Sequence, residues 1–549
     1  MRRRRRLLTV VLTVAACAIA PAAAQAAGWI PGPDIADAGL TGAADMATDA
    51  AGVTTVVWVE RLLDGDGVIA RRLQPDGALG PRLPLGRGGW PDVAVTPGGT
   101  AVVSWIEPAD GSSTLKLRTI APDGAVRPTP VAVATLDAEP VLEHVATAVA
   151  PDGSALATWS LAADGALHAR RVAPDGTPDA PVVLGPAGGD DRAYAALADD
   201  GAGFVAWTDR TGDAQPRYAR LTAAGALDGG GQLADAGYAA NAVAGAAGGL
   251  LVWYERSDDH SSEMAIRAVR LPASGGATVP IATLDVGSYD VTAHETVPAT
   301  LAPDGTATLL YGPQGEFEGY GATTVARQVT PSGAVGAPLE LAPPGRLYLP
   351  YQLVRRGDGT LLPLWLSLSP ATPATVAFDA LPLAADGSAR GPAAAPFAPV
   401  STGGLGAIVL AAGGQTAVAG LVQPGATGRF RTAFFDDAPP RLEVSAPAAV
   451  ARGEAATFAA TADDSSGVAE IAWQFGDGAT ATGAAASHVY TGTGSYTVTV
   501  TATDAVGERT VVTRTVAVAD RRRRPVRPAR LDRRRRRARR RRAREPRRG

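Results

Sequence analysis

The chain has 549 residues and a single cysteine, Cys17, which excludes an internal disulfide and a site built from several thiolates. Its length exceeds what one ordinary core supports, so we expect more than one folded part. The formal net charge of −3 conceals 52 acidic against 28 basic side chains in residues 28–520, and 18 arginines in residues 521–549. The acidic body repels nucleic acid, and we expect no nucleic-acid partner for it.

Residues 1–26 are predicted to form an export signal. Arg2–Arg6 supply its basic region, Leu7–Ala20 its apolar region, and Ala24-Gln25-Ala26 a cleavage motif. The apolar stretch is shorter than the roughly 20 residues that span a bilayer, and we expect no transmembrane segment. A second interpretation treats Val14-Ala15-Ala16-Cys17 as a lipobox in which Cys17 is lipidated. Either way the protein is expected to be secreted or associated with the cell envelope.

A glycine followed six positions later by a large aromatic residue recurs along residues 27–437. The aromatic residues lie 46 to 58 positions apart, a period typical of repeated β-units. Two units depart from the pattern, because Gly248 precedes its aromatic residue by five positions and Gly420 replaces the last aromatic residue. Apolar flanks predict structural packing between units, rather than ligand binding, for Trp58, Trp105, Trp159, Trp207, Trp253, Tyr311 and Trp365.

Each unit also contains a turn of the Pro75-Asp76-Gly77 kind and short alternating runs of Val, Ala, Leu and Thr. Four short strands per unit predict an all-β fold, a β-propeller over residues 27–437 with eight blades, or seven if a late unit is irregular. The eighth unit lacks a fourth strand, which the segment Trp29–Ala38 would supply, closing the ring and removing exposed sheet edges. A linear β-solenoid is the rival architecture, although its units are usually shorter.

Residues 440–519 form a separate segment with alternating strands, which predicts an antiparallel β-sandwich with Trp473 in its core. It contains Trp473-Gln474-Phe475-Gly476-Asp477-Gly478, followed by the run Tyr496-Thr497-Val498-Thr499-Val500. At these residues the segment resembles the PKD (polycystic-kidney-disease) repeat, and only Gln474 departs from the Trp-Asp-Phe-Gly-Asp-Gly signature. The resemblance implies an immunoglobulin-like extracellular module for spacing, adhesion or polysaccharide contact, usually without catalysis of its own.

Some relatives of this module bind calcium. By that resemblance, Asp463, Asp464 and Asp504 are candidate calcium ligands gathered at one edge of the sandwich. Calcium is the one cofactor considered, and we expect no other.

The arginine-rich residues 520–549 cannot bury a core and are predicted to be disordered. Nucleic-acid binding is disfavoured because an exported protein rarely meets DNA and the tail has no aromatic residue for stacking. Two interpretations stay open: binding to anionic envelope polymers or lipid headgroups, and folding back onto the acidic body.

Residues suited to catalysis are sparse. The five histidines show no metal-ligand spacing, although His144 and His294 occupy similar places in their units. No nucleophile elbow or phosphate-binding glycine loop occurs. Acidic residues two positions after the aromatic residues are expected to pair across strands with arginines, as Glu60 with Arg71, Glu107 with Arg118, Asp209 with Arg217, and Glu255 with Arg267.

We therefore expect a monomeric exported protein that binds or adheres, contacting an extracellular polysaccharide or protein, with no catalytic residues. The alternative is a secreted carbohydrate-active enzyme, a glycoside hydrolase or polysaccharide lyase, that uses the PKD-like part as an accessory module. An enzyme should bring at least two carboxylates and an arginine or histidine into one axial pocket, and a binding protein should not.

Overall fold

The computed structural model describes residues 28–521 except 37–38, 64, 138–144, 162, 189–192, 247, 257–262, 273–277, 289–296, 313–323, 343–346, 370–374, 402–404, 426–427 and 465. The predicted export signal and the tail beyond Arg521 lie outside the described residues. The chain divides into two units, Met1–Asp437 and Ala438–Gly549. The described residues contain strands and no helix, and thus no helix that could cross a membrane.

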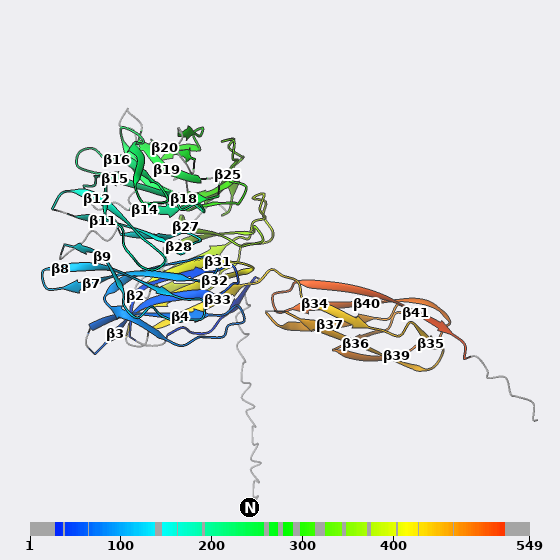
Figure 1. Cartoon of the computed structure of the whole chain (residues 1–549). Helices are drawn as coiled ribbons and strands as arrows, with labels where there is room; N and C mark the ends of the chain where they lie inside the picture. Colours follow the sequence, from blue (N-terminus) through cyan, green and yellow to red (C-terminus); the bar gives the residue numbers. More distant parts are fainter. Residues whose placement is uncertain are drawn as a thin grey trace, which may run out of the picture. The chain divides into compact units, whose positions relative to one another are not determined.

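In its described part, the N-terminal unit contains eight antiparallel sheets that follow one another along the chain (Figure 1). The first four sheets, each given from its inner strand outward, are β2 (Leu40–Thr48), β3 (Thr54–Leu62), β4 (Gly65–Leu73) and β5 (Leu83–Arg87); β6 (Gly89–Val95), β7 (Ala101–Ala109), β8 (Ser112–Ile120) and β9 (Val131–Leu136); β10 (Ala146–Val149), β11 (Ala155–Leu161), β12 (Ala166–Val172) and β13 (Val182–Pro186); and β14 (Tyr194–Leu197), β15 (Gly203–Asp209), β16 (Gln215–Leu221) and β17 (Leu227–Gln232).

The fifth sheet carries an additional strand, β22, that pairs with β20. The last four sheets are β18 (Gly237–Gly245), β19 (Gly248–Arg256), β20 (Glu263–Leu271) and β21 (Val279–Pro280), with β22 (Asp285–Ser288); β23 (Ala299–Leu301), β24 (Ala307–Tyr311), β25 (Val325–Val329) and β26 (Leu339–Glu340); β27 (Leu347–Arg355), β28 (Leu361–Ser369), β29 (Thr375–Ala380) and β30 (Val400–Ser401); and β31 (Ala407–Gly413), β32 (Thr416–Gln423), β33 (Arg429–Phe435) and β1 (Trp29–Pro31).

The inner strands close a ring. Each neighbours the inner strand of the next sheet, in the order β2, β6, β10, β14, β18, β23, β27 and β31, and β31 returns to β2. Sheets arranged radially in a closed ring are the blades of a β-propeller. The outermost strand of the last blade is β1, paired antiparallel with β33 so that Trp29 lies opposite Phe435. This is the place to which the sequence assigned the segment beginning at Trp29.

The glycine of the repeat forms the turn between the first two strands of a blade. Gly52 and Gly153 have φ of 85° and 88°, a region that side-chain-bearing residues rarely adopt. The N–H of Gly52 donates to the carbonyl of Asp49 at 3.0 Å, and that of Gly153 to Ala150 at 2.9 Å. The repeat thus marks a hairpin whose geometry favours glycine.

The seven aromatic residues of the repeat are at most 9% exposed and pack between blades. Trp105 on β7 lies in one apolar cluster with Val57 and Leu85 of the preceding blade. Its Nε1 donates to the carbonyl of Arg87 at 2.9 Å. A Cβ at Gly86 would lie 2.7 Å from the Trp105 ring, so the neighbouring strand needs glycine there.

The last blade loses its aromatic residue for a steric reason. Gly420 lies on β32, and a Cβ there would stand 2.7 Å from the ring of Phe430 and 2.9 Å from the sulfur of Met46. Phe430, on the adjacent strand β33, is fully buried and packs edge-on against Trp58. The aromatic ring that fills this inter-blade space therefore comes from the neighbouring strand.

The predicted cross-strand ion pairs form in two of four cases. Arg217 lies 2.8 Å from Asp209, and Arg267 pairs with Glu255. In both blades the arginine stands directly opposite the aromatic residue of the repeat, Arg217 opposite Trp207 and Arg267 opposite Trp253.

The other two predicted pairs were wrong. Glu60 pairs with Arg82, and Glu107 lies 3.0 Å from Lys116. The register explains the difference, because the two arginines stand two positions farther along, Arg71 opposite Val56 and Arg118 opposite Val103.

These two arginines instead bind carbonyls and join consecutive blades. Arg71 donates to Gly80 of its own blade at 2.7 Å and to Ile35, in the segment after β1, at 3.1 Å. Arg118 donates to Arg127 and to Leu85 of the preceding blade, both at 2.6 Å. Charge-assisted bonds to backbone carbonyls therefore replace the expected surface ion pairs.

The C-terminal unit is a two-sheet sandwich of immunoglobulin-like type. One sheet has the order β34 (Arg441–Ser445), β36 (Ala455–Asp463) and β39 (Ala485–Val489); the other has the order β35 (Ala449–Ala451), β41 (Arg509–Ala519), β40 (Gly494–Asp504), β37 (Val468–Gln474) and β38 (Thr480–Thr482). Trp473 is fully buried between the sheets, and its Nε1 donates to Gly483 at 2.8 Å. The predicted core position of Trp473 is the observed one.

Trp29→Ala should destabilise the propeller by about 3–5 kcal/mol, the usual cost of truncating a buried tryptophan. Trp29 is 2% exposed and packs edge-on against Phe435, with ring centroids 5.2 Å apart. Urea unfolding of the full chain measures the effect. Trp90→Ala is the matched control, because Trp90 is 58% exposed. Equal midpoints for the two variants would show that β1 does not hold the last blade.

Candidate functional site

An axial cavity of about 630 Å³ opens where the inner strands converge. Most of its wall is made of alanine and glycine, because side chains from several blades meet at the axis and small residues leave the space open. The remaining lining residues include the rings or polar groups of Trp90, Asp92, Thr147, Tyr194 and Asn241. Few polar groups in a concave wall of small residues are typical of a ligand site.

Trp90 reaches this cavity through a bulge in β6. Gly89 pairs with Ile106 and Asp92 with Ser104, so two residues, Trp90 and Pro91, stand opposite one. Pro91 has no N–H to offer a ladder and is suited to such a position.

The backbone at Trp90 is strained. Its φ is 52°, the one positive value for a non-glycine residue in the described part of the chain. The preceding Gly88 is required, because a Cβ there would lie 2.1 Å from the carbonyl oxygen of Ile106. The strained bulge holds a tryptophan that is 58% exposed, where burial would normally be favoured. Backbone strain that keeps a large aromatic ring in solvent is typical of a ligand-binding position.

Asp45 and Asp92 form a carboxyl pair beside the cavity. Asp45, on β2, accepts a hydrogen bond from the N–H of Val93 at 2.9 Å. Burial raises the pKa of Asp45, although hydrogen bonds from the backbone and from the Asp92 side chain oppose the rise. The pair can therefore hold a proton at a pH where an exposed aspartate has lost it.

Other polar residues on the inner strands join neighbouring blades. Asn241 Nδ2 donates to the carbonyl of Val297 at 2.9 Å, and Gln352 Oε1 accepts from the N–H of Leu410 at 2.7 Å. The bond from Val93 to Asp45 joins the first two blades in the same way. These contacts give Asp45, Asn241 and Gln352 a structural role independent of any ligand.

Paired carboxyl groups and a basic residue in one axial pocket are the two features expected of an enzyme, and the described residues at the cavity provide only the first. Asp92 and its partner Asp45 provide two carboxyl groups, but among the described residues that line the cavity there is no arginine, lysine or histidine. A basic side chain is one common means of stabilising negative charge in a transition state, and the described lining offers only neutral donors such as Asn241 for that role. The arrangement suits hydrogen bonding and ring stacking.

The described histidines take part in packing. His168 lies 3.0 Å from Asp164 and stacks on Trp159. His488 lies 2.8 Å from Asp477 and stacks on Phe475. His144, His260 and His294 lie outside the described residues, so the suggested convergence of His144 and His294 is not tested.

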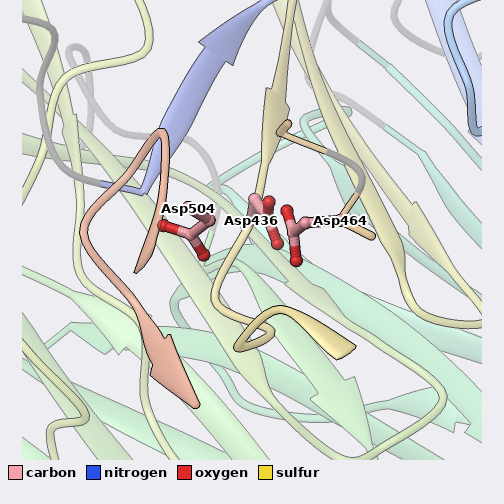
Figure 2. Close-up of side chains that lie close together, drawn as sticks. All are labelled: Asp436, Asp464 and Asp504. Carbon is pink, nitrogen blue, oxygen red and sulfur yellow. The ribbon is translucent and has the colours of Figure 1, made fainter. Parts of the chain in front are cut away.

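Two of the three calcium candidates lie together in the C-terminal unit. Figure 2 shows Asp464 and Asp504, which have carboxylate oxygens within 4.8 Å of each other. Asp504 Oδ1 accepts N–H groups from Val506, Gly507 and Glu508, all at 3.0 Å or less, while Oδ2 has no hydrogen-bond partner among the described residues. A buried carboxylate oxygen without a hydrogen-bond donor is suited to coordinate a cation.

Asp463 is placed differently. It is exposed at the end of β36, opposite Arg441, whereas Asp464 accepts hydrogen bonds from the N–H and hydroxyl of Ser466 at 2.8 and 2.7 Å. Figure 2 also labels Asp436, which belongs to the N-terminal unit, where its N–H donates to Gly28 at 2.8 Å. Two carboxylates are fewer than the six to eight oxygens that calcium takes, and calcium binding stays a prediction.

Sequence reasoning overlooked Trp90, Asp92 and Asp45. The sequence does distinguish Trp90. Apart from Trp29, it is the one tryptophan in residues 27–437 that lies outside the glycine–aromatic repeat. The run Gly88-Gly89-Trp90-Pro91, directly before the expected first strand of the second unit, also combines two glycines and a proline. Its position at the axis depends on the closure of the ring and could not be read from spacing.

Asp45→Asn should stabilise the protein at about pH 8 and have little effect at about pH 4. Because the pKa of Asp45 is raised, the folded state binds the proton more tightly than the unfolded chain. Tighter proton binding at Asp45 stabilises the folded state at low pH, and this stabilisation is lost as the pH rises through the folded-state pKa of Asp45. An asparagine amide resembles the protonated carboxyl and removes the loss.

Thermal unfolding across this pH range measures the effect of the Asp45 substitution. Asp110→Asn, which alters an exposed carboxylate, is the control and should leave the pH profile unchanged. A gain from Asp45→Asn that is equal at every pH would contradict the assignment.

Calcium should stabilise the sandwich if Asp464 and Asp504 are ligands, by about 2.7 kcal/mol at a concentration one hundred times the dissociation constant. Hydrogen exchange of the loop after Asp504 in the full chain, with calcium and with chelator, measures the protection. Asp464→Asn should abolish the difference, and Asp463→Asn should keep it because Asp463 points to solvent. Identical exchange in calcium and in chelator would exclude the site.

Comparisons with known proteins assign a family to the C-terminal unit. Residues 437–519 match the family model of the PKD domain. The PKD1 domain of the Vibrio cholerae metalloprotease PrtV is 34% identical, and the match covers 15% of this chain and 100% of that one, with a TM-score of 0.13. The PKD1 domain of Vibrio anguillarum Epp is 29% identical, with coverages of 16% and 100% and a TM-score of 0.14.

Matches to the N-terminal unit have lower sequence identity. The β-propeller domain of the Trilobed protease from Pyrococcus furiosus is 9% identical over 66% of this chain and 99% of that one, with a TM-score of 0.38. No curated protein matches the chain. The propeller is therefore assigned from its own strand order. Through residues 437–519 the chain belongs to the PKD domain family.

Proposed function

We propose that this chain is an exported, non-catalytic protein that binds an extracellular polysaccharide at the axial cavity of its propeller. The observation that carries the proposal is Trp90, held by a strained bulge with 58% of its surface exposed at the mouth of a 630 Å³ cavity. Sugar rings stack their apolar faces on aromatic side chains, while polar groups such as Asp92 and Thr147 suit their hydroxyls. PKD domains are typical of extracellular proteins, which agrees with the predicted export signal.

The other parts of the chain have supporting roles in this proposal. The PKD domain acts as an accessory module, a spacer or a second contact with the polysaccharide. The arginine-rich tail associates with anionic envelope polymers, because its charge is opposite to theirs and little else in its composition could bind.

One observation favours the alternative of a secreted carbohydrate-active enzyme. Asp45 and Asp92 are hydrogen-bonded beside the cavity, and the pKa of Asp45 is raised. Glycosidases also use one protonated and one ionised carboxyl, but these flank the scissile bond about 5–9.5 Å apart and do not touch each other. The direct contact between Asp45 and Asp92 leaves no room for a glycosidic bond between them and favours binding instead.

Trp90→Ala should weaken binding to the recognised polysaccharide by about tenfold or more, because exposed tryptophans at the centre of a site commonly contribute over 1 kcal/mol. Affinity electrophoresis against a panel of soluble plant, fungal and bacterial polysaccharides measures the loss. Val183→Ala is the control, since Val183 on β13 is 55% exposed and lies away from the cavity. Equal retardation of both variants would reject Trp90 as the contact.

The same panel tests the alternative and the tail. Release of reducing ends or unsaturated sugars that disappears in Asp92→Asn would establish the enzyme and reject the binding-only function. A chain truncated after Arg521 should keep its affinity for neutral polysaccharide but dissociate from envelope material at low salt. Unchanged retention on the envelope would reject the role of the tail.

A further inference from the structure

A second cavity lies on the other side of Trp90. It has a volume of about 650 Å³ and opens between the first two blades. Ala43 and Trp90 line both this inter-blade cavity and the axial cavity. The indole ring is therefore a ridge between two adjoining hollows, and each is large enough for part of a ligand.

Because Trp90 borders both cavities, the length of a ligand decides how much of the site it fills. A compact ligand would occupy one hollow and leave the other in contact with water. An extended chain could cross the ring and place one unit in each hollow, so that the exposed Trp90 surface is covered along the middle of the chain. Such a chain would cover much of the Trp90 surface, of which 58% is exposed.

The charges lining the two hollows limit the chemistry of that chain. The axial cavity contributes Asp92, and the inter-blade cavity contributes Asp66, Glu107 and Arg87. Asp66 is paired with Arg61 at 3.3 Å and Glu107 with Lys116 at 3.0 Å, which fixes both carboxylates at the rim. With Arg61 and Lys116 on two of the three carboxylates and Arg87 nearby, the lining carries little net charge, which suits a neutral chain rich in hydroxyl groups.

We propose that the axial and inter-blade cavities form one cleft, which binds a linear oligosaccharide without acidic groups across Trp90. At least three consecutive sugar units are engaged, one in each cavity and one stacked on the ring. This inference rests on the proposed polysaccharide-binding function and specifies the length, linearity and charge of the ligand. Glu107 and Asp66 contact only those units that pass beyond Trp90.

Calorimetry on the full chain tests the cleft with oligomers of β-1,4-linked glucose and of β-1,4-linked N-acetylglucosamine, from monosaccharide to hexasaccharide, and with oligogalacturonate as the anionic counterpart. For the preferred neutral series, affinity should rise by about tenfold or more between one and three units and then level off. Trp90→Ala should abolish the rise. Glu107→Gln should weaken only the chains of three units or more, while Val183→Ala should match the unsubstituted protein.

The results separate the cleft from the function on which it rests. Affinity that does not depend on length, or a Glu107→Gln variant equal to the unsubstituted protein at every length, would reject the cleft but leave binding at the axial cavity intact. Tighter binding of oligogalacturonate would overturn the charge argument. No binding by any neutral chain, together with no polysaccharide retained in the wider panel, would reject the function itself.

Discussion

Closure of the ring by β1 is the constraint on which the rest of the propeller depends. An open last blade would expose the edge of β33, and each blade is held mainly by its two neighbours. Pairing of Trp29 with Phe435 joins the two ends of the unit and buries both rings. A chain without disulfides thereby obtains a continuous set of inter-blade cores.

The inter-blade packing also explains how an axial site can exist. Large rings such as Trp58 and Trp105, on the second strand of their blades, fill the space between neighbouring blades. Near the axis the strands converge, and alanine and glycine leave a hollow whose polar residues bind neighbouring strands. The same closure that stabilises the ring therefore creates a concave surface, to which a bulge can add one exposed ring.

Function and stability compete at that bulge. A regular β6 would pair every residue and avoid the positive φ at Trp90, yet it would place no ring at the mouth of both cavities. The Asp45–Asp92 pair similarly combines a bond that joins two blades with a buried carboxyl that costs stability when it ionises. Both features lie in the first two blades, while the inner strands of later blades complete the wall of the axial cavity.

The sequence by itself determined the repeat period, the hairpin glycines, the buried aromatic residues and the PKD motif, because each depends on local pattern and turn geometry. It also predicted that Trp29 lies in the closing strand. It did not determine that Arg71 binds Ile35 and not Glu60, because strand register sets cross-strand neighbours. Only the tertiary structure brought Asp45 of β2 beside Asp92 of β6 and placed Trp90 at the axis, since the two strands belong to separate blades and no spacing along the chain records their distance.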